Sequence, residues 1–124
     1  MSDALRGKCA IETAKISLVD DAIMTRTALD AAGVERMGKT IDLAKGDPRI
    51  QKLTALLDGT SATLTDMRSV DARFAIRLSC ANEDEADRVI IGSKGFDEGV
   101  FVRVSDKSYK LPATFRSDLT ALIR

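Results

Sequence analysis

The chain has 124 residues, with 19 basic and 19 acidic side chains and no histidine, so its formal net charge is zero. This length is typical of one domain that folds around its own core without a metal or a disulfide framework. A nucleic-acid-binding surface needs a basic excess or several exposed rings, and the balanced charge and an aromatic content of 4% argue against both. No apolar run approaches the length of a membrane-spanning helix, about 20 residues. We therefore expect a single domain over residues 1–124 that binds neither nucleic acid nor membrane.

The N-terminus and the two cysteines bear on the cellular compartment. Residues 1–8 lack the apolar segment of a signal peptide, which favours the cytoplasm. If a leader has been removed, the protein is periplasmic or secreted instead. Cys9 lies near the start of the first predicted strand and Cys80 ends a later one, so the sequence leaves two alternatives open: a disulfide, or two small apolar thiols.

The first predicted strand runs from Ile11 to Leu18, because apolar residues there alternate with polar ones. Ile11 and Glu12 break this alternation and indicate a bulge or an initial helical turn. The rival interpretation is an N-terminal helix, in which Leu5, Cys9 and Ile16 share one stripe. We favour the strand because Glu12 would fall on that stripe.

Residues 20–43 carry weaker signals. Asp20 and Asp21 are able to cap a short helix that extends to Met24. A second helix is predicted over residues 31–37, after Asp30 and before the stop signal of Gly38. Residues 40–43 alternate like a short strand at the edge of a sheet.

The clearest start signal in the chain is Asp47-Pro48, a capping residue followed by proline at the first helical position. It predicts a helix from Pro48 to Leu57 with an apolar stripe. Gly59 is expected to end this helix in the left-handed conformation. Residues 60–65 are rich in serine and threonine and are predicted to form a loop.

Residues 73–112 have the pattern of an antiparallel meander. Strands are predicted over residues 73–80, 88–91 and 100–104, followed by a last strand near Tyr109. The unbroken apolar run Val89-Ile90-Ile91 favours a central strand covered on both sides. Residues 105–108 are interpreted either as a tight turn on Asp106-Lys107 or as a longer loop. One face of the meander is apolar and carries Phe74, Ile76, Leu78, Val100, Val102 and Val104.

A final helix is predicted from Ala113 to Ile123, with its apolar side chains on one face. Strands grouped together with helices at the flanks indicate the α+β class. We expect an antiparallel sheet of about four to six strands, with two or three short helices packed on one face.

The sequence lacks the residues that several kinds of chemistry require. Without histidine there is no Ser-His-Asp or Cys-His nucleophile and no common zinc site, and neither a Cys-x-x-Cys motif nor a phosphate-binding glycine loop is present. The acidic run at residues 83–87 is expected to be a solvated hairpin tip, with a calcium site as the alternative. We predict no cofactor, no metal and no catalytic residue.

Binding residues are predicted at a loop and on the polar sheet face. Phe96 lies between Gly95 and Gly99, followed by Asp97 and Glu98, and exposed aromatic residues in loops often anchor partners. The alternative is that Phe96 folds back over the core. The polar face is expected to carry arginines that either bind a partner or pair with nearby acids, namely Arg73, Arg77, Arg88 and Arg103. From these, Arg77 and Arg103 are our candidates.

These features predict a non-catalytic protein-binding module, of the kind represented by small bacterial inhibitors or immunity proteins that act on a partner enzyme. The expected partner is therefore another protein. The alternative is a small-ligand-binding or carboxylate-based catalytic domain, with a pocket between the sheet and residues 20–40.

Overall fold

The structure, a computed structural model, describes residues 5–19, 30–66, 72–81, 87–93, 99–104 and 107–123. These residues form three helices and seven strands, which confirms the α+β class and exceeds the expected four to six strands. Along the chain the elements are β1 (Ile11–Leu18), α1 (Ala31–Met37), β2 (Lys39–Leu43), α2 (Pro48–Gly59), β3 (Thr63–Thr65), β4 (Phe74–Cys80), β5 (Arg88–Gly92), β6 (Val100–Val104), β7 (Lys107–Leu111) and α3 (Phe115–Leu122).

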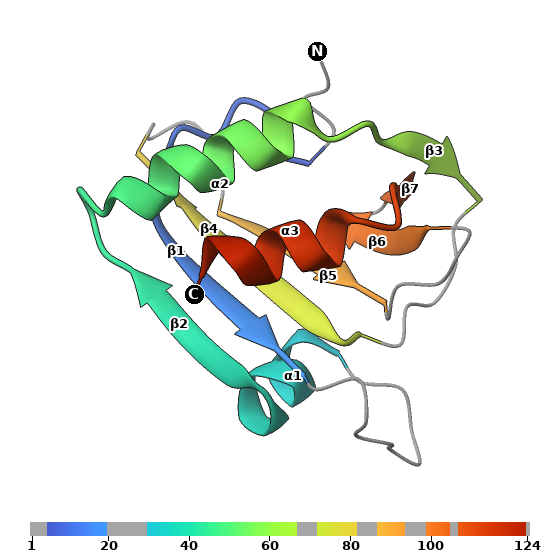
Figure 1. Cartoon of the computed structure of the whole chain (residues 1–124), viewed down its shortest axis with the longest axis horizontal. Helices are drawn as coiled ribbons and strands as arrows, with labels where there is room; N and C mark the ends of the chain where they lie inside the picture. The colour runs from blue at the N-terminus through green and yellow to red at the C-terminus, as the bar shows by residue number, and fades with distance from the viewer. Residues whose placement is uncertain are drawn as a thin grey trace.

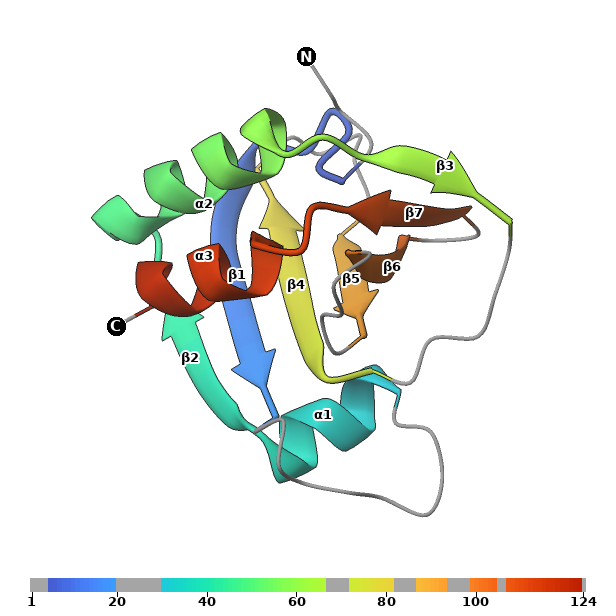
Figure 2. The ribbon, with the colours of Figure 1, turned by 45° about the vertical axis from the view of Figure 1, so that its right-hand side comes forward.

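All seven strands belong to one antiparallel sheet with the order β2-β1-β4-β5-β6-β7-β3. The predicted meander is confirmed, because β4 to β7 are neighbours in chain order. The N-terminal strand β1 pairs with β4, and its ladder shifts register between Ile11 and Thr13, which confirms the predicted bulge. In Figures 1 and 2 the β7–β3 end of the sheet bends toward α2 and α3.

The apolar face of the sheet is the core. The register places Ile16 of β1 beside Ile76 of β4, and Ile76 beside Ile90 of β5. Helices α2 and α3 lie side by side over this face (Figure 1). The rings of Phe74 and Phe115 meet there with centroids 5.8 Å apart. The six residues predicted for this face are all buried, as are the helix residues Leu53, Leu57 and Leu119.

Helix α1 lies on the opposite face, so the expectation that the helices share one face is wrong for α1. Its Val34 is fully buried in a second small apolar cluster with Ala75, and Ile91 packs against that cluster. Ala75 and Ile91 belong to the face that the sequence pattern marks as polar. They give α1 an apolar surface to pack on, and α1 lies beside the end of β1 and the start of β4 (Figure 2).

Two helices begin as their sequences predict. The carboxylate of Asp30 accepts a hydrogen bond from the backbone N–H of Gly33, and that of Asp47 accepts one from Arg49. The helix α2 extends to Gly59, which is itself helical, so the predicted left-handed stop is wrong; Thr60 is the C-cap. Helix α3 begins two residues later than predicted.

Two predictions about connections are also wrong. Residues 60–65 are not only a loop, because Thr63–Thr65 form β3 and pair with β7. Neither of the two alternatives left open for residues 105–108, a turn on Asp106-Lys107 or a longer loop, has the observed bounds, since Lys107 is already in β7 and pairs with Val104. The short helix expected after Asp20 lies outside the described residues.

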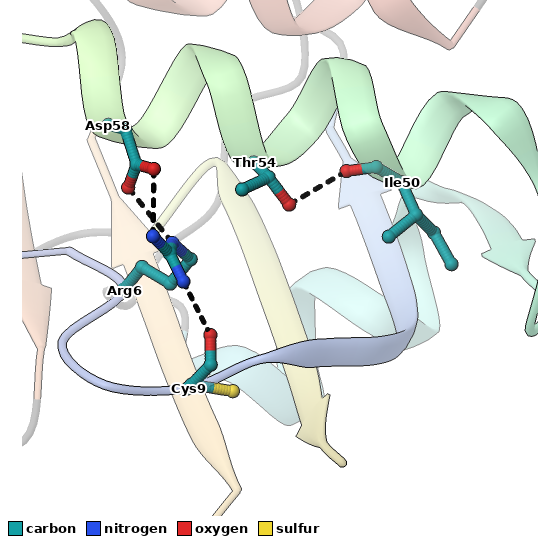
Figure 3. Close-up of polar contacts among 5 residues, drawn as sticks. All are labelled: Arg6, Cys9, Ile50, Thr54 and Asp58. Carbon is teal, nitrogen blue, oxygen red and sulfur yellow. Dashed lines mark hydrogen bonds and ion pairs between the residues drawn. The ribbon is translucent and has the colours of Figure 1, made fainter. Parts of the chain in front are cut away.

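The N-terminal segment is joined to the sheet by a disulfide and to α2 by an ion pair. Cys9 and Cys80 form a disulfide with their Cα atoms 5.1 Å apart, so the structure contains the first of the two alternatives left open above. The guanidinium of Arg6 donates two hydrogen bonds to Asp58 of α2, at 2.9 and 2.7 Å, and one to the Cys9 carbonyl (Figure 3). The bond to Asp58 raises the pKa of Arg6. Leu5 is fully buried beside this anchor.

Candidate functional site

The face of the sheet that α2 and α3 leave uncovered is called the outer face here. Strand side chains alternate between faces, and paired residues share a face. The register therefore assigns Lys15, Arg77 and Arg103 to the outer face. The same rule adds the other residues of this face, which are Thr13, Ser17, Thr40, Asp42, Thr63, Thr65, Ala75, Ser79, Val89, Ile91, Phe101, Ser108 and Lys110.

The outer face has a basic bias that the neutral chain as a whole does not show. Among the described strand residues with a register partner on this face, the cations are Lys15, Arg77, Arg103 and Lys110, and Asp42 is the acid. Lys15 stands directly between Asp42 and Arg77 in the register. The register also places Lys39, Arg88 and Lys107 on the core side among the apolar residues, so the cations of the strands are divided between both sides of the sheet.

Helix α1 supplies a second acid at the border of this face. Glu35 accepts hydrogen bonds from Nε and Nη2 of Arg77, at 2.7 and 2.8 Å. The hydrogen bond from Arg77, followed by attraction to Arg77 and to Lys15, holds the pKa of Glu35 below its ordinary value of 4.5. The same pair raises the pKa of Arg77. Both groups are therefore charged at neutral pH, and Glu35 fixes the direction of the Arg77 side chain.

An apolar strip runs between the two candidate arginines. Val89 pairs with Arg77, and Ile91 pairs with Arg103, so two neighbouring β5 residues separate the guanidinium groups. Arg77 and Arg103 lie two strands apart, which corresponds to about 10 Å across the sheet. Phe101 follows on β6 beside Arg103. Val89, Ile91, Phe101 and Arg103 are all half-buried.

Next to this strip, the outer face contains an open groove of about 350 Å³ across β2, β1, β4 and β5. Its lining includes the basic residues Lys15 and Arg77 and the hydroxyl-bearing residues Thr13 and Ser79. The carboxylates in the lining are Asp42 and Asp87. The alternative of a carboxylate pocket remains a prediction.

The structure brings Arg77 and Arg103 onto one face, as the sequence indicates, but separates the other two arginines from them. Arg73 precedes β4, is buried, and donates to the Ala72 carbonyl at 3.2 Å. Arg88 pairs with Leu78 and so belongs to the core side of the sheet. The loop candidates Phe96, Asp97 and Glu98 lie outside the described residues.

Of the acidic run, the structure describes Asp87, which accepts a hydrogen bond from the backbone N–H of Cys80 at 3.3 Å. In the described part of the chain, no group of three or more acidic or cysteine side chains is placed to hold a metal ion. None of the described helices is long and apolar enough to cross a membrane.

Lys15, Lys110 and Phe101 also belong to the outer face, and the sequence analysis did not single them out. Lys15 carried a usable signal, because it alternates with the buried Ala14 and Ile16. Comparisons of the chain with protein-family models, with curated proteins and with solved structures found no match. The geometry of the outer face therefore provides the argument for function.

Proposed function

We propose that this protein is a non-catalytic protein-binding module whose outer face contacts the partner. The observation that carries the proposal is the apolar strip of Val89 and Ile91 between Arg77 and Arg103, with Phe101 beside Arg103 on β6. Aromatic residues and arginine are enriched at protein interfaces, because a ring supplies apolar contact area and a guanidinium supplies several fixed donors.

The charge of this face favours a partner with an acidic surface. Four cationic strand residues stand against Asp42 and the α1 residue Glu35. Complementary charge accelerates encounter and selects partners, and its effect weakens as salt screens the charges. We therefore propose an interface with an apolar centre at Val89 and at the part of Ile91 that the α1 cluster leaves accessible, and with a basic rim at Lys15 and Lys110.

The disulfide supports a further part of the proposal, an oxidising compartment such as the bacterial periplasm or the extracellular space. Disulfides persist where thiols are not kept reduced. The bridge between Cys9 and Cys80 joins segments 71 residues apart and contributes to a small domain that has no described metal site. A stable, secreted binding domain fits an inhibitor or immunity-type protein that acts on a partner enzyme.

The test begins by capturing the partner from native cells with the purified chain and identifying it by mass spectrometry. Binding to the purified partner is then measured with Lys15→Glu and Lys110→Glu combined. Both side chains are exposed, so the double variant is expected to fold. We expect at least about tenfold weaker binding, mostly through slower association, because like charges would now face each other across the interface.

The matched control is Lys52→Glu, which reverses an exposed charge on α2, over the opposite face of the sheet. It should bind like the wild type. If the outer-face variant and the control lose affinity equally, net charge and not the outer face determines binding. If the outer-face variant binds like the wild type at low salt, the proposed interface is wrong.

A further inference from the structure

The strand β3 is short, uncharged and placed at the edge of the sheet. It pairs with β7 on one side, and the sheet order places no strand of the described chain on its other side. From Gly59 to Thr65 the sequence has no charged residue. Leu64, at the centre of β3, has 66% of its surface exposed, the larger value of the two exposed large hydrophobic residues in the described part of the chain.

The pairing of β6 with β7 and of β7 with β3 determines which way the backbone N–H and C=O groups of Leu64 point. Two residues separate Val104 from Lys107, so these two residues form the closing pair of the β6–β7 hairpin. In such a hairpin the N–H and C=O groups of the closing pair bond to each other. Hydrogen-bonded and non-hydrogen-bonded pairs alternate along an antiparallel ladder. Ser108 and Lys110 therefore direct their backbone groups toward β3, where they meet Thr65 and Thr63.

Leu64 pairs with Tyr109 between these two bonded pairs, so its own N–H and C=O point away from β7. An edge strand with such outward groups is a template for another strand. Natural edges are usually protected by charged side chains, by proline or by a bulge. None of the three residues of β3 is charged or a proline.

The segment is also complementary to itself. In an antiparallel pair of β3 strands centred on Leu64, the two Leu64 residues would face each other and exchange both backbone hydrogen bonds. Thr63 would face Thr65 of the other copy, and threonine pairs across strands are favourable. Asp66 would face Ala62, so no like charges meet. A chain with zero net charge adds no general repulsion between copies.

We propose that β3 is a self-association site, at which two copies of this chain join edge to edge through Leu64 to form one continuous sheet. The occupant is a second copy because the Thr-Leu-Thr strand matches its own two-fold-related copy in charge and side-chain type. The contact is small, so the dimer is weak and reversible and forms only at high protein concentration. This proposal does not depend on the outer-face interface.

The test is sedimentation equilibrium of the oxidised chain over a wide range of concentration. The wild type should show a reversible monomer–dimer equilibrium, whereas Leu64→Lys should remain monomeric throughout, because two lysines would face each other at the centre of the contact. Met37→Lys is the matched control, since Met37 is 43% exposed and lies on α1 next to β2, at the opposite edge of the sheet from β3. This control should dimerise like the wild type.

A second variant tests the contribution of the Leu64 backbone N–H independently of a charged side chain at this position. Leu64→Pro removes the outward N–H and leaves the bonds of Thr63 and Thr65 to β7 in place, so it should fold and also remain monomeric. A wild type that stays monomeric at every concentration would overturn the proposal and leave this edge for a strand of a different protein. Equal dimerisation of Leu64→Lys and the wild type would overturn it as well.

Discussion

The two ends of the sheet are built in different ways. At the β2 end, β1 and β4 are joined by the Cys9–Cys80 disulfide, and α1 packs on the outer face through Val34. The β3 end is a three-residue strand that pairs with β7 alone. The edge residues differ as well, because β2 exposes Lys39 and Asp42 and β3 exposes Leu64.

Because of this difference, one end of the sheet stabilises the fold and the other end has an edge to which another strand has access. Charged side chains protect the β2 edge from another strand, and the disulfide and α1 hold the strands beside it in place. The β3 edge lacks both the charges and the covalent support. We infer that the β2 end maintains the fold, while β3 keeps its pairing with β7 and leaves its outer edge available to another strand.

The largest effect should come from removing the disulfide. Replacing Cys9 and Cys80 together with alanine opens a loop closed over a separation of 71 residues, and the chain-entropy argument assigns about 4 kcal/mol to such a loop. Urea unfolding should show this loss of unfolding free energy, and hydrogen exchange should show faster opening of β1. A loss below about 1 kcal/mol would contradict the role assigned to the β2 end.

A smaller effect is expected at the ion pair between α1 and β4. Because Arg77 lowers the pKa of Glu35 in the folded chain, the pair stabilises the fold above the ordinary pKa of 4.5. That contribution disappears as the pH falls through the lowered pKa. The Arg77 side chain is 44% exposed, so the contribution should be below about 1 kcal/mol.

An NMR titration of the Glu35 carboxyl measures this directly. In the variant Arg77→Ala the pKa of Glu35 should move up toward its ordinary value, and Arg103→Ala should leave it unchanged. An unchanged Glu35 pKa in Arg77→Ala would show that the pair contributes nothing in solution.

Side-chain periodicity was sufficient to predict most of the fold. The alternation in residues 11–18 and 74–80 follows the burial of one face, and the Asp47-Pro48 signal depends only on neighbouring residues. The strand β3 could not be predicted in this way. Its residues carry no apolar alternation, and it forms because it meets β7, more than forty residues further along the chain.

The outer face was predictable only in part. Arg77 and Arg103 alternate with buried residues, so their common face follows from the sequence. The strip between them depends on the register of β5, which no local pattern determines. The position of α1 is a similar case, because it depends on Ala75 and Ile91 being neighbours across two strands.

The contrast between the two ends is tested most directly by hydrogen–deuterium exchange of the wild-type chain at low and at high concentration. We predict that a peptide covering residues 60–66 becomes protected as concentration rises, while a peptide covering residues 39–43 exchanges at the same rate throughout. Protection of residues 39–43, or no change at residues 60–66, would contradict the account.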